Sequence, residues 1–255
     1  PVINKPIMKV ITSIPGLNQV IFKKIRNTLL SAFGGNVREI VMGGAALNPE
    51  VESWFKKFKL PYTVGYGMTE AAPLMAYEDW WDFAPKSCGK AIDTIEVRID
   101  SEDPYNKVGE IQARGMNVMS GYFKNEEATN AAFTEDGWMR TGDLGVIDKK
   151  GNIFIKGRSK NMILSANGQN IYPEEIEAVV NNQPYVIESV VVDRGAKLVA
   201  LVYMDTDKMV SENVNLEEYK ANQNQTSFIY AYDSDGNEVE LARLHGEEDR
   251  VWVDL

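Results

Sequence analysis

The chain has 255 residues, 44% of them hydrophobic, which is enough to bury the core of one large domain or of two modest ones. Its 37 acidic and 27 basic residues give a formal net charge of −10, which argues against nucleic acid and anionic lipid as main partners, since both need clustered Lys and Arg. A single cysteine, Cys88, excludes an internal disulfide and a cysteine zinc cluster, and a single histidine, His245, removes the usual base of most catalytic triads.

The sequence predicts no segment that inserts into a membrane. No run of about 18 apolar residues is present, so no membrane span is predicted, and the first residues contain no apolar core of a signal peptide. We therefore expect a cytoplasmic protein. Peripheral association with a membrane and the oligomeric state stay open.

The first part of the chain alternates predicted helices and strands. Apolar residues at helical spacing predict a helix over residues 20–33, and Gly34 ends it. Residues 37–42 predict a strand, and Asn48 caps a second helix. The expected buried face of that helix contains Val51, Trp54, Phe55 and Phe58. This order is typical of a layered α/β domain, in which ligands bind at the carboxyl ends of parallel strands.

Two glycine-rich turns follow the predicted strands. The first is G-G-A-A at residues 43–46, and the second lies in Y-T-V-G-Y-G-M-T-E-A-A-P at residues 62–73. Gly65 and Gly67 let the backbone of the second turn approach a ligand closely or adopt positive φ. Because both turns lie at the carboxyl ends of predicted strands, we expect them to form one site.

The second turn also carries functional groups. Tyr66 offers an aromatic face, Thr69 a hydroxyl and Glu70 a carboxylate. A stacking surface, a phosphate donor and a metal ligand are what a loop that holds a nucleotide and its Mg²⁺ needs. The alternative is a tight strand-to-helix turn in which Thr69 is an ordinary N-cap.

After residue 92 the apolar period changes to two, which predicts short strands. The segments concerned are residues 95–99, 111–113 and 118–123. They indicate a small antiparallel sheet or barrel lobe. A short helix over residues 126–133 and a hairpin over residues 145–156 follow.

Residues 157–161 are polar and contain no core residue, which is typical of a linker. Beyond them, Pro173 begins a helix, and hairpins are predicted over residues 186–205 and 228–241. The inner face of the helix is expected to contain Ile176, Val179 and Val180.

Five spaced motifs between residues 40 and 177 resemble those of one family. They are Gly43-Gly44-Ala45-Ala46-Leu47; Gly65-Tyr66-Gly67-Met68-Thr69-Glu70; Gly109-Glu110 with Gly121-Tyr122; Gly137-Trp138 with Arg140-Thr141-Gly142-Asp143; and Gly157-Arg158 with Asn167-Gly168 and Tyr172-Pro173-Glu174-Glu175-Ile176-Glu177. In this order they strongly resemble the adenylate-forming (AMP-binding) acyl-CoA synthetases, and the chain looks closest to the long-chain fatty acid–CoA ligases.

The resemblance implies a ligase reaction in two halves, a step of fatty acid metabolism. A fatty or other carboxylic acid attacks the α-phosphate of ATP to give an acyl-adenylate and pyrophosphate, and the thiol of CoA then displaces AMP. ATP or AMP, Mg²⁺ and CoA are the implied cofactors and substrates. Adenylyl transfer depends mostly on positioning and charge neutralisation, so it needs no histidine.

The implied fold class is α/β plus α+β: the C-terminal part of a large layered α/β and small β-barrel domain, followed by a small α+β domain. Residues 1–157 would belong to the large adenylate-binding domain, with an α/β part at 1–90 and a β-rich lobe at 91–157. Residues 158–255 would form the small mobile domain.

The resemblance also implies roles for residues of the glycine turns. Gly43, Gly44 and Ala45 would line the adenine. Tyr66 would stack on it, with Gly67 in the same nucleotide-binding loop.

The remaining nucleotide contacts implied by the resemblance are polar. Thr69 and Glu70 would be the catalytic residues, Thr69 bonding the α-phosphate and Glu70 holding Mg²⁺. Asp143 would accept hydrogen bonds from the ribose hydroxyls, and Arg158 would reach the same ribose. A carboxylate suits two ribose donors because charge-assisted hydrogen bonds are the stronger ones; the alternative for Asp143 is an Asx-turn after Gly142.

Lys160 is implied as the hinge about which the small domain swivels between the half-reactions (domain alternation), and a polar segment without core residues can absorb such a φ/ψ change. Asn167 and Gly168 would enter the channel for the pantetheine arm of CoA.

Two elements of the family pattern are missing from the sequence: the Ser/Thr/Gly-rich phosphate loop and the catalytic lysine near the C-terminus. The chain therefore looks like a fragment, and we expect that alone it does not form acyl-adenylate at a useful rate. Residues 221–255 show no resemblance, and their role stays open.

Two other functions remain alternatives. One is an adenylation module that loads a carrier-protein thiol instead of CoA. The other is a degenerate, non-catalytic nucleotide-binding module. The length of the acyl chain is not determined by the sequence.

Overall fold

The computed structural model describes residues 17–164, 169–194, 198–212 and 214, and the backbone of three further strands between residues 228 and 254. The chain divides into two compact units. The first comprises Pro1–Thr141 and Gly145–Ile155, and the second comprises Gly142–Leu144 and Lys156–Leu255. The domain assignment expected from the sequence, with its boundary between residues 157 and 158, stays a prediction.

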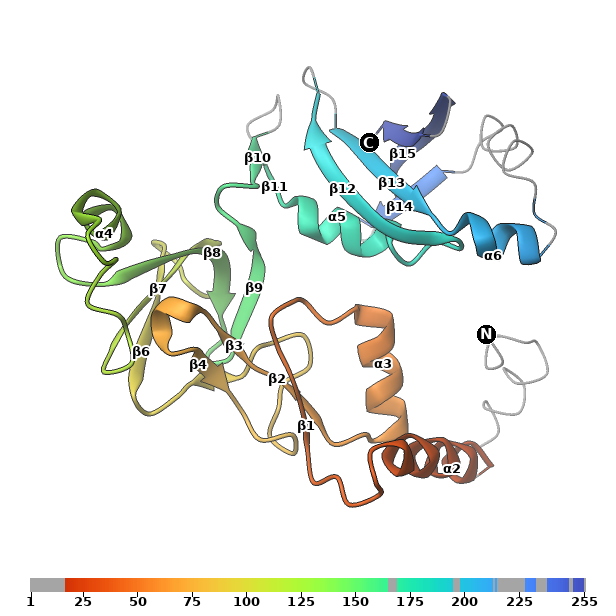
Figure 1. The fold of residues 1–255 in the computed structure, drawn as a ribbon, viewed down its shortest axis with the longest axis horizontal. Coiled ribbons are helices and arrows are strands. Elements are labelled where there is room, and N and C mark those ends of the chain that lie inside the picture. The colour runs from red at the N-terminus through yellow and green to blue at the C-terminus, as the bar shows by residue number, and fades with distance from the viewer. Residues whose placement is uncertain are drawn as a thin grey trace. The chain divides into compact units, whose positions relative to one another are not determined.

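The first unit begins with helices and a parallel strand pair (Figure 1). The elements are α2 (Leu17–Ala32), β1 (Ile40–Met42), α3 (Pro49–Phe58) and β2 (Tyr62–Val64). β1 and β2 run parallel with Ile40 opposite Tyr62, and α2 packs on α3 through an edge-to-face contact between Phe22 and Phe58. The predicted alternation of helix and strand is confirmed in this part of the chain.

Helix α3 begins as predicted, and its predicted inner face is confirmed for Phe58 at 7% exposure but not for Val51. Asn48 Oδ1 accepts hydrogen bonds from the backbone N–H groups of the first turn, one of them at 2.9 Å. Val51, expected inside, is 39% exposed, whereas Glu52 is only 5% exposed. Glu52 Oε1 accepts from the Tyr62 hydroxyl at 3.2 Å and from the backbone N–H of Lys86 at 2.8 Å. A carboxylate with two donors can be buried, and apolar spacing alone does not predict this.

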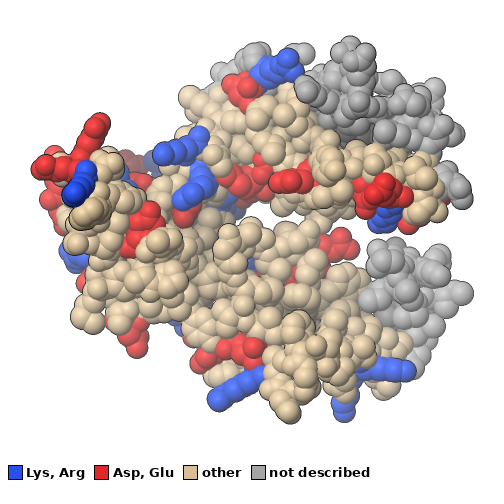
Figure 2. All heavy atoms as spheres, viewed as in Figure 1, with Lys and Arg blue, Asp and Glu red and all other residues tan. Residues whose placement is uncertain are grey.

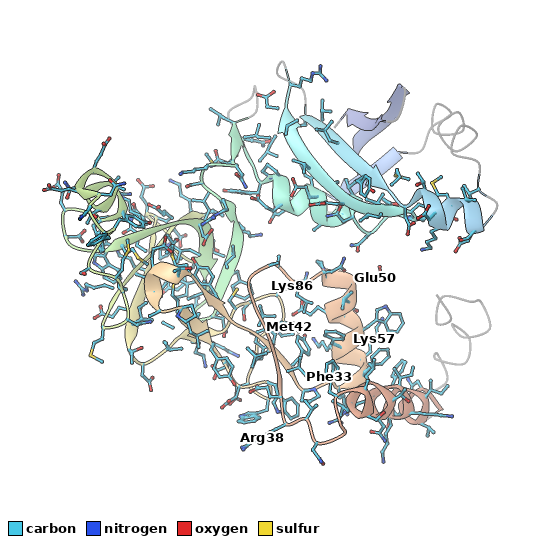
Figure 3. All side chains as sticks on the ribbon, viewed as in Figure 1. Phe33, Arg38, Met42, Glu50, Lys57 and Lys86 are labelled. Carbon is cyan, nitrogen blue, oxygen red and sulfur yellow. The ribbon has the colours of Figure 1, made fainter. Side chains whose placement is uncertain are left out.

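Figure 3 shows Lys86 close to the N-terminal end of α3, the end that also carries the exposed Glu50. Lys86 has φ +68, so its backbone turns sharply at the residue whose N–H reaches Glu52. The buried carboxylate therefore joins α3, β2 and the turn at residues 84–88.

Two further sheets complete the first unit. The three-stranded sheet contains β3 (Tyr66–Gly67), β4 (Leu74–Tyr77) and β5 (Lys90–Ala91), with the short 3-10 helix η1 (Thr69–Ala71) between β3 and β4. The four-stranded sheet has the order β6-β7-β8-β9, from β6 (Ile95–Asp100), β7 (Gly109–Gly115), β8 (Met139–Ile147) and β9 (Ile153–Arg158). Residues 142–144 of β8 and 156–158 of β9 belong to the second unit. The fully buried Met75, Ile111 and Ile153 join the two sheets in one core cluster.

The fold class is confirmed as mixed helix and sheet, but two details differ from the sequence prediction. In the described part of the chain the β-rich lobe is an open sheet rather than a barrel, because four strands in the order β6-β7-β8-β9 leave two outer strands unpaired with each other. Residues 118–123 form a loop rather than a strand, followed by α4 (Glu126–Ala132). Val118 packs against the core cluster, whereas Phe123 is 89% exposed.

The second unit packs a helix on an antiparallel sheet (Figure 1). The sheet order is β12-β13-β16-β15-β14, and α5 packs on β12. Its elements are β10 (Ile163–Leu164), β11 (Asn170–Ile171), α5 (Pro173–Val180), β12 (Val186–Asp193), β13 (Leu198–Met204), α6 (Thr206–Ser211), β14 (Phe228–Tyr232), β15 (Glu238–Glu247) and β16 (Arg250–Asp254). Both predicted hairpins are present, and Val180 is 2% exposed as expected, but Val179 is 39% exposed.

Charged side chains of both signs are interspersed on the face drawn in Figure 2. Ion pairs among the described residues include that of Arg140 with Glu110 at 2.9 Å. Within the described ranges, no helix combines the length and the apolar character needed to cross a bilayer.

Candidate functional site

The two glycine turns lie next to each other at the carboxyl ends of β1 and β2. The N–H of Gly65 donates to the carbonyl of Met42 at 2.8 Å. A Cβ on Gly43 would lie 3.2 Å from the Gly65 carbonyl oxygen, and Gly44 has φ +84. Gly43, Gly44 and Ala45 are exposed, so the first turn presents mainly backbone to a ligand at this edge.

Gly67 is required by a close approach of two backbone segments. A Cβ there would lie 1.9 Å from the carbonyl oxygen of Pro73, and the adjacent Met68 N–H donates to that oxygen at 2.8 Å. Tyr66, one residue earlier, is 7% exposed and belongs to the core cluster. Most of its ring therefore contacts protein, and its stacking on a base stays a prediction.

Thr69 and Glu70 lie in η1 and differ in how they are held. Met68, not Thr69, occupies the N-cap position, so the alternative of Thr69 as an ordinary N-cap is wrong. Thr69 is exposed, and in the described part of the chain its hydroxyl has no hydrogen-bond partner. Glu70 Oε1 accepts from the Tyr122 hydroxyl at 2.9 Å, and this hydrogen bond raises the pKa of Tyr122.

The residues around Glu70 fit a Mg²⁺ ion that arrives with a nucleotide. No group of three His, Cys, Asp or Glu side chains in the described ranges could form a protein cage for a metal. Mg²⁺ is commonly bound by one or two carboxylates together with substrate phosphates and water. A single half-buried carboxylate held in place by a tyrosine is compatible with that mode of binding.

In the second unit, Asp143 and Arg158 form an ion pair. Arg158 Nε donates to Asp143 Oδ1 at 2.8 Å, and the exposed fractions of the two side chains are 58% and 14% respectively. The pair is brought together by β8 and β9, where the Ser159 N–H donates to the Gly142 carbonyl at 2.8 Å. Gly142 has φ +72, which favours glycine directly before the aspartate. The structure thus joins two residues that the sequence predicted from separate motifs.

Lys160 follows this pair in an exposed turn. The turn is closed by the Met162 N–H, which donates to the Arg158 carbonyl at 3.1 Å. Asn161 Nδ2 donates to Glu174 Oε1 at 2.8 Å, which connects the turn to α5. Asn167 and Gly168 lie outside the described residues, so their predicted place in a CoA channel stays a prediction.

Two residues that contact candidate residues, one in each unit, received no role from the sequence. Tyr122 belongs to a motif that carried the family resemblance, yet its hydrogen bond to Glu70 spans 52 positions of the chain. Glu174 has a buried Oε2 without a partner among the described residues, and a Cβ on Gly157 would lie 2.6 Å from it. The one available signal was membership of a motif, since the partner of each residue is distant in sequence.

Two open hollows among the described residues lie along α2. One is lined by Ile21, Lys24, Ile25, Thr28 and Leu29, all on one helix. The surface of a single helix does not enclose a ligand, and no candidate residue lines it.

Known proteins resemble the chain over both units. The profile of the AMP-binding enzyme family matches residues 3–123. A long-chain-fatty-acid–CoA ligase, FadD15 of Mycobacterium bovis, is 34% identical over 191 residues, which are 74% of this chain and 30% of that protein. Luciferin 4-monooxygenase of Photinus pyralis is 32% identical over 215 residues, covering 79% of this chain and 39% of that protein.

Solved structures agree with these sequence matches. An O-succinylbenzoate coenzyme A synthetase of Bacillus subtilis, in complex with ATP and magnesium, has a TM-score of 0.60 and 29% identity. The match covers 70% of this chain and 40% of that chain. The chain thus spans well under half the length of these relatives.

Proposed function

Since the chain belongs to the adenylate-forming, AMP-binding family of acid–thiol ligases, we propose that it supplies nucleotide contacts to an enzyme that activates a carboxylic acid with ATP. An oxygen of the carboxylic acid attacks the α-phosphate, the bond to pyrophosphate breaks, and an acyl-adenylate forms. The CoA thiol then attacks the acyl carbon, and AMP leaves with the bonding electron pair.

A long-chain fatty acid is the proposed substrate. The similarity to the mycobacterial long-chain ligase supports this choice. The relatives that act on luciferin and on O-succinylbenzoate show that family membership alone does not fix the acid. Competition of palmitate with short and aromatic acids in the whole protein would test the proposal, and competition of CoA with a carrier protein would test the thiol.

The proposed roles follow the chemistry of each group. The exposed backbone of Gly43, Gly44 and Ala45 would receive the adenine. The Thr69 hydroxyl would donate to the α-phosphate, and Glu70 would hold Mg²⁺, which supplies neutralisation of phosphate charge when bound.

In the second unit, Asp143 would accept from the ribose hydroxyls, with Arg158 beside it. Lys160 would serve as the hinge residue, since it lies in an exposed turn directly after the ion pair.

The observation that most supports a ribose site is the Asp143–Arg158 pair. The arginine fixes one carboxylate oxygen at 2.8 Å, so the orientation of the carboxylate is set before a ligand arrives. Charged acceptors that are already oriented make the stronger hydrogen bonds to hydroxyl donors. An isolated Asx-turn would not need the arginine.

Titration calorimetry with AMP and Mg²⁺ tests the proposal on this chain. Asp143→Ala removes a charge-assisted acceptor and is expected to weaken AMP binding by about 2 kcal/mol, or roughly thirtyfold. Glu175→Ala is the matched control, because Glu175 is also an ion-paired carboxylate of the second unit, with Lys156 at 2.8 Å. Absence of heat with the unmodified chain, or equal affinity for both variants, would contradict the proposed function.

A further inference from the structure

The loop at residues 117–122 is fastened to the turn that carries Glu70. Asn117 Nδ2 donates to the carbonyl oxygens of Ala71 at 2.8 Å and Leu74 at 2.9 Å. The backbone N–H of Met119 donates to the Glu70 carbonyl at 2.7 Å. With the Tyr122 hydroxyl on Glu70 Oε1, these contacts hold both the backbone and the side chain of Glu70.

Tyr122 is itself fixed from the other side. Its N–H donates to Thr129 Oγ1 at 2.9 Å, and that hydroxyl donates to the Asn125 carbonyl at 2.8 Å in the first turn of α4. A Cβ on Gly121 would lie 2.6 Å from Thr129 Cγ2, so the backbone passes close to the helix here. The backbone of Tyr122 is therefore held by α4, independently of Glu70.

A hydroxyl held in this way restricts a flexible side chain. The glutamate side chain loses rotamer freedom when it is immobilised, and a hydrogen bond made before a ligand arrives removes part of that cost from the binding step. Carboxylates that ligate metals are commonly oriented by such hydrogen bonds, and the loss of one typically reduces metal affinity 10- to 100-fold.

We propose that Tyr122 is a positioning residue that orients the Glu70 carboxylate toward the cation of a bound metal–nucleotide. The proposal rests on the proposed function, because that function gives Glu70 its ligand. Tyr122 touches neither the nucleotide nor the metal in this scheme, and it acts through Glu70 alone. Removal of its hydroxyl should therefore weaken metal-dependent binding and leave metal-free nucleotide binding unchanged.

The test measures binding of Mn²⁺ with ATP by electron paramagnetic resonance, and binding of AMP without metal by calorimetry, on the full chain. Tyr122→Phe is expected to weaken Mn²⁺ binding roughly tenfold, with metal-free AMP affinity unchanged. Tyr105→Phe is the matched control, because Tyr105 is a 51% exposed tyrosine whose hydroxyl has no partner among the described residues. Its Mn²⁺ affinity should equal that of the unmodified chain.

Repeating the Tyr122→Phe measurement in a Glu70→Gln variant separates orientation of the Glu70 carboxylate from a general disturbance of the loop at residues 117–122. Glu70→Gln keeps the oxygen that accepts from Tyr122 but loses the charge that a cation needs. In this background, Tyr122→Phe should cause no further loss of Mn²⁺ affinity. An equal loss in both backgrounds, or no loss in either, would overturn the inference while the proposed function stands. If the unmodified chain binds neither AMP nor Mn²⁺ with ATP, the proposed function fails and the inference falls with it.

Discussion

Gly157→Ala tests the contact that holds the proposed hinge segment. The new Cβ would lie 2.6 Å from Glu174 Oε2 and 3.3 Å from the Cδ of the same residue. The carboxylate cannot move without loss, because its other oxygen accepts from Asn161 Nδ2 at 2.8 Å. Hydrogen bonds to charged groups contribute about 1.5–3 kcal/mol, so displacement of Glu174 is expected to cost about 2 kcal/mol locally.

The same substitution should be harmless once Glu174 is gone. In a Glu174→Ala background the nearest remaining atom is Tyr172 Cβ, 3.5 Å from the new Cβ, which is ordinary contact. Gly157 is not in the left-handed region, so the alanine adds no backbone strain there and stabilises by about 0.4–1 kcal/mol through the unfolded state. The effect of Gly157→Ala on local stability should therefore differ between the two backgrounds by at least about 2 kcal/mol.

Limited trypsin digestion measures this coupling, because Arg158 and Lys160 are exposed cleavage sites within the segment. When opening is fast, cleavage follows the population of the open form, and 2 kcal/mol corresponds to roughly thirtyfold faster cleavage. Glu175→Ala is the control, since it removes only a solvent-exposed ion pair to Lys156. Equal acceleration by Gly157→Ala in both backgrounds would refute the reasoning.

Two further predictions concern the first unit. Hydrogen bonds, chiefly from Arg98 and secondly from Thr134, lower the pKa of Asp136 to about 2. The ionised Asp136 therefore stabilises the fold fully above its pKa in the unfolded chain, and this stabilisation is lost as the pH falls through about 2. Urea midpoints of the unmodified chain and Asp136→Asn should therefore differ at pH 6 and converge toward pH 2; a constant difference would contradict this. Glu52→Ala leaves two inward-pointing donors without an acceptor and should lower the free energy of unfolding by about 3 kcal/mol. Glu50→Ala, at an exposed position of the same helix, should change the free energy of unfolding little. Equal urea midpoints for the two variants would contradict the role of Glu52.

Much of the fold follows from local rules that act over a few residues. Asn48 caps α3 and Gly34 ends α2 because caps and positive φ depend on immediate neighbours. The glycine turns after β1 and β2 follow from the same short-range preferences, together with parallel pairing. These parts of the structure were predicted correctly because each needs little information from distant segments.

Contacts between distant segments set the limit of sequence reasoning. Residues 118–123 have strand-like apolar residues, yet they form a loop. Their N–H groups donate to the Glu70 and Gly115 carbonyls and to the Thr129 hydroxyl rather than to a neighbouring strand. The burial of Glu52 was not predicted, because helical spacing does not reveal donors from residues 62 and 86. In both cases a polar partner far along the chain decided the outcome.

The same distinction separates the two kinds of functional residue in this chain. Glu70 and Asp143, which would contact the metal and the nucleotide, carry functional groups whose chemistry can be recognised in their own motifs. The side chains that orient these carboxylates, Tyr122 and Arg158, also lie in motifs, but they are 52 and 15 positions from their partners, so the pairing itself was not predicted. Binding affinity depends on both kinds of residue, since ordering a flexible protein side chain during binding costs part of the binding free energy. Variants of Tyr122 and Arg158 therefore test whether the carboxylates must be pre-oriented, whereas variants of Glu70 and Asp143 test only whether the carboxylates are needed.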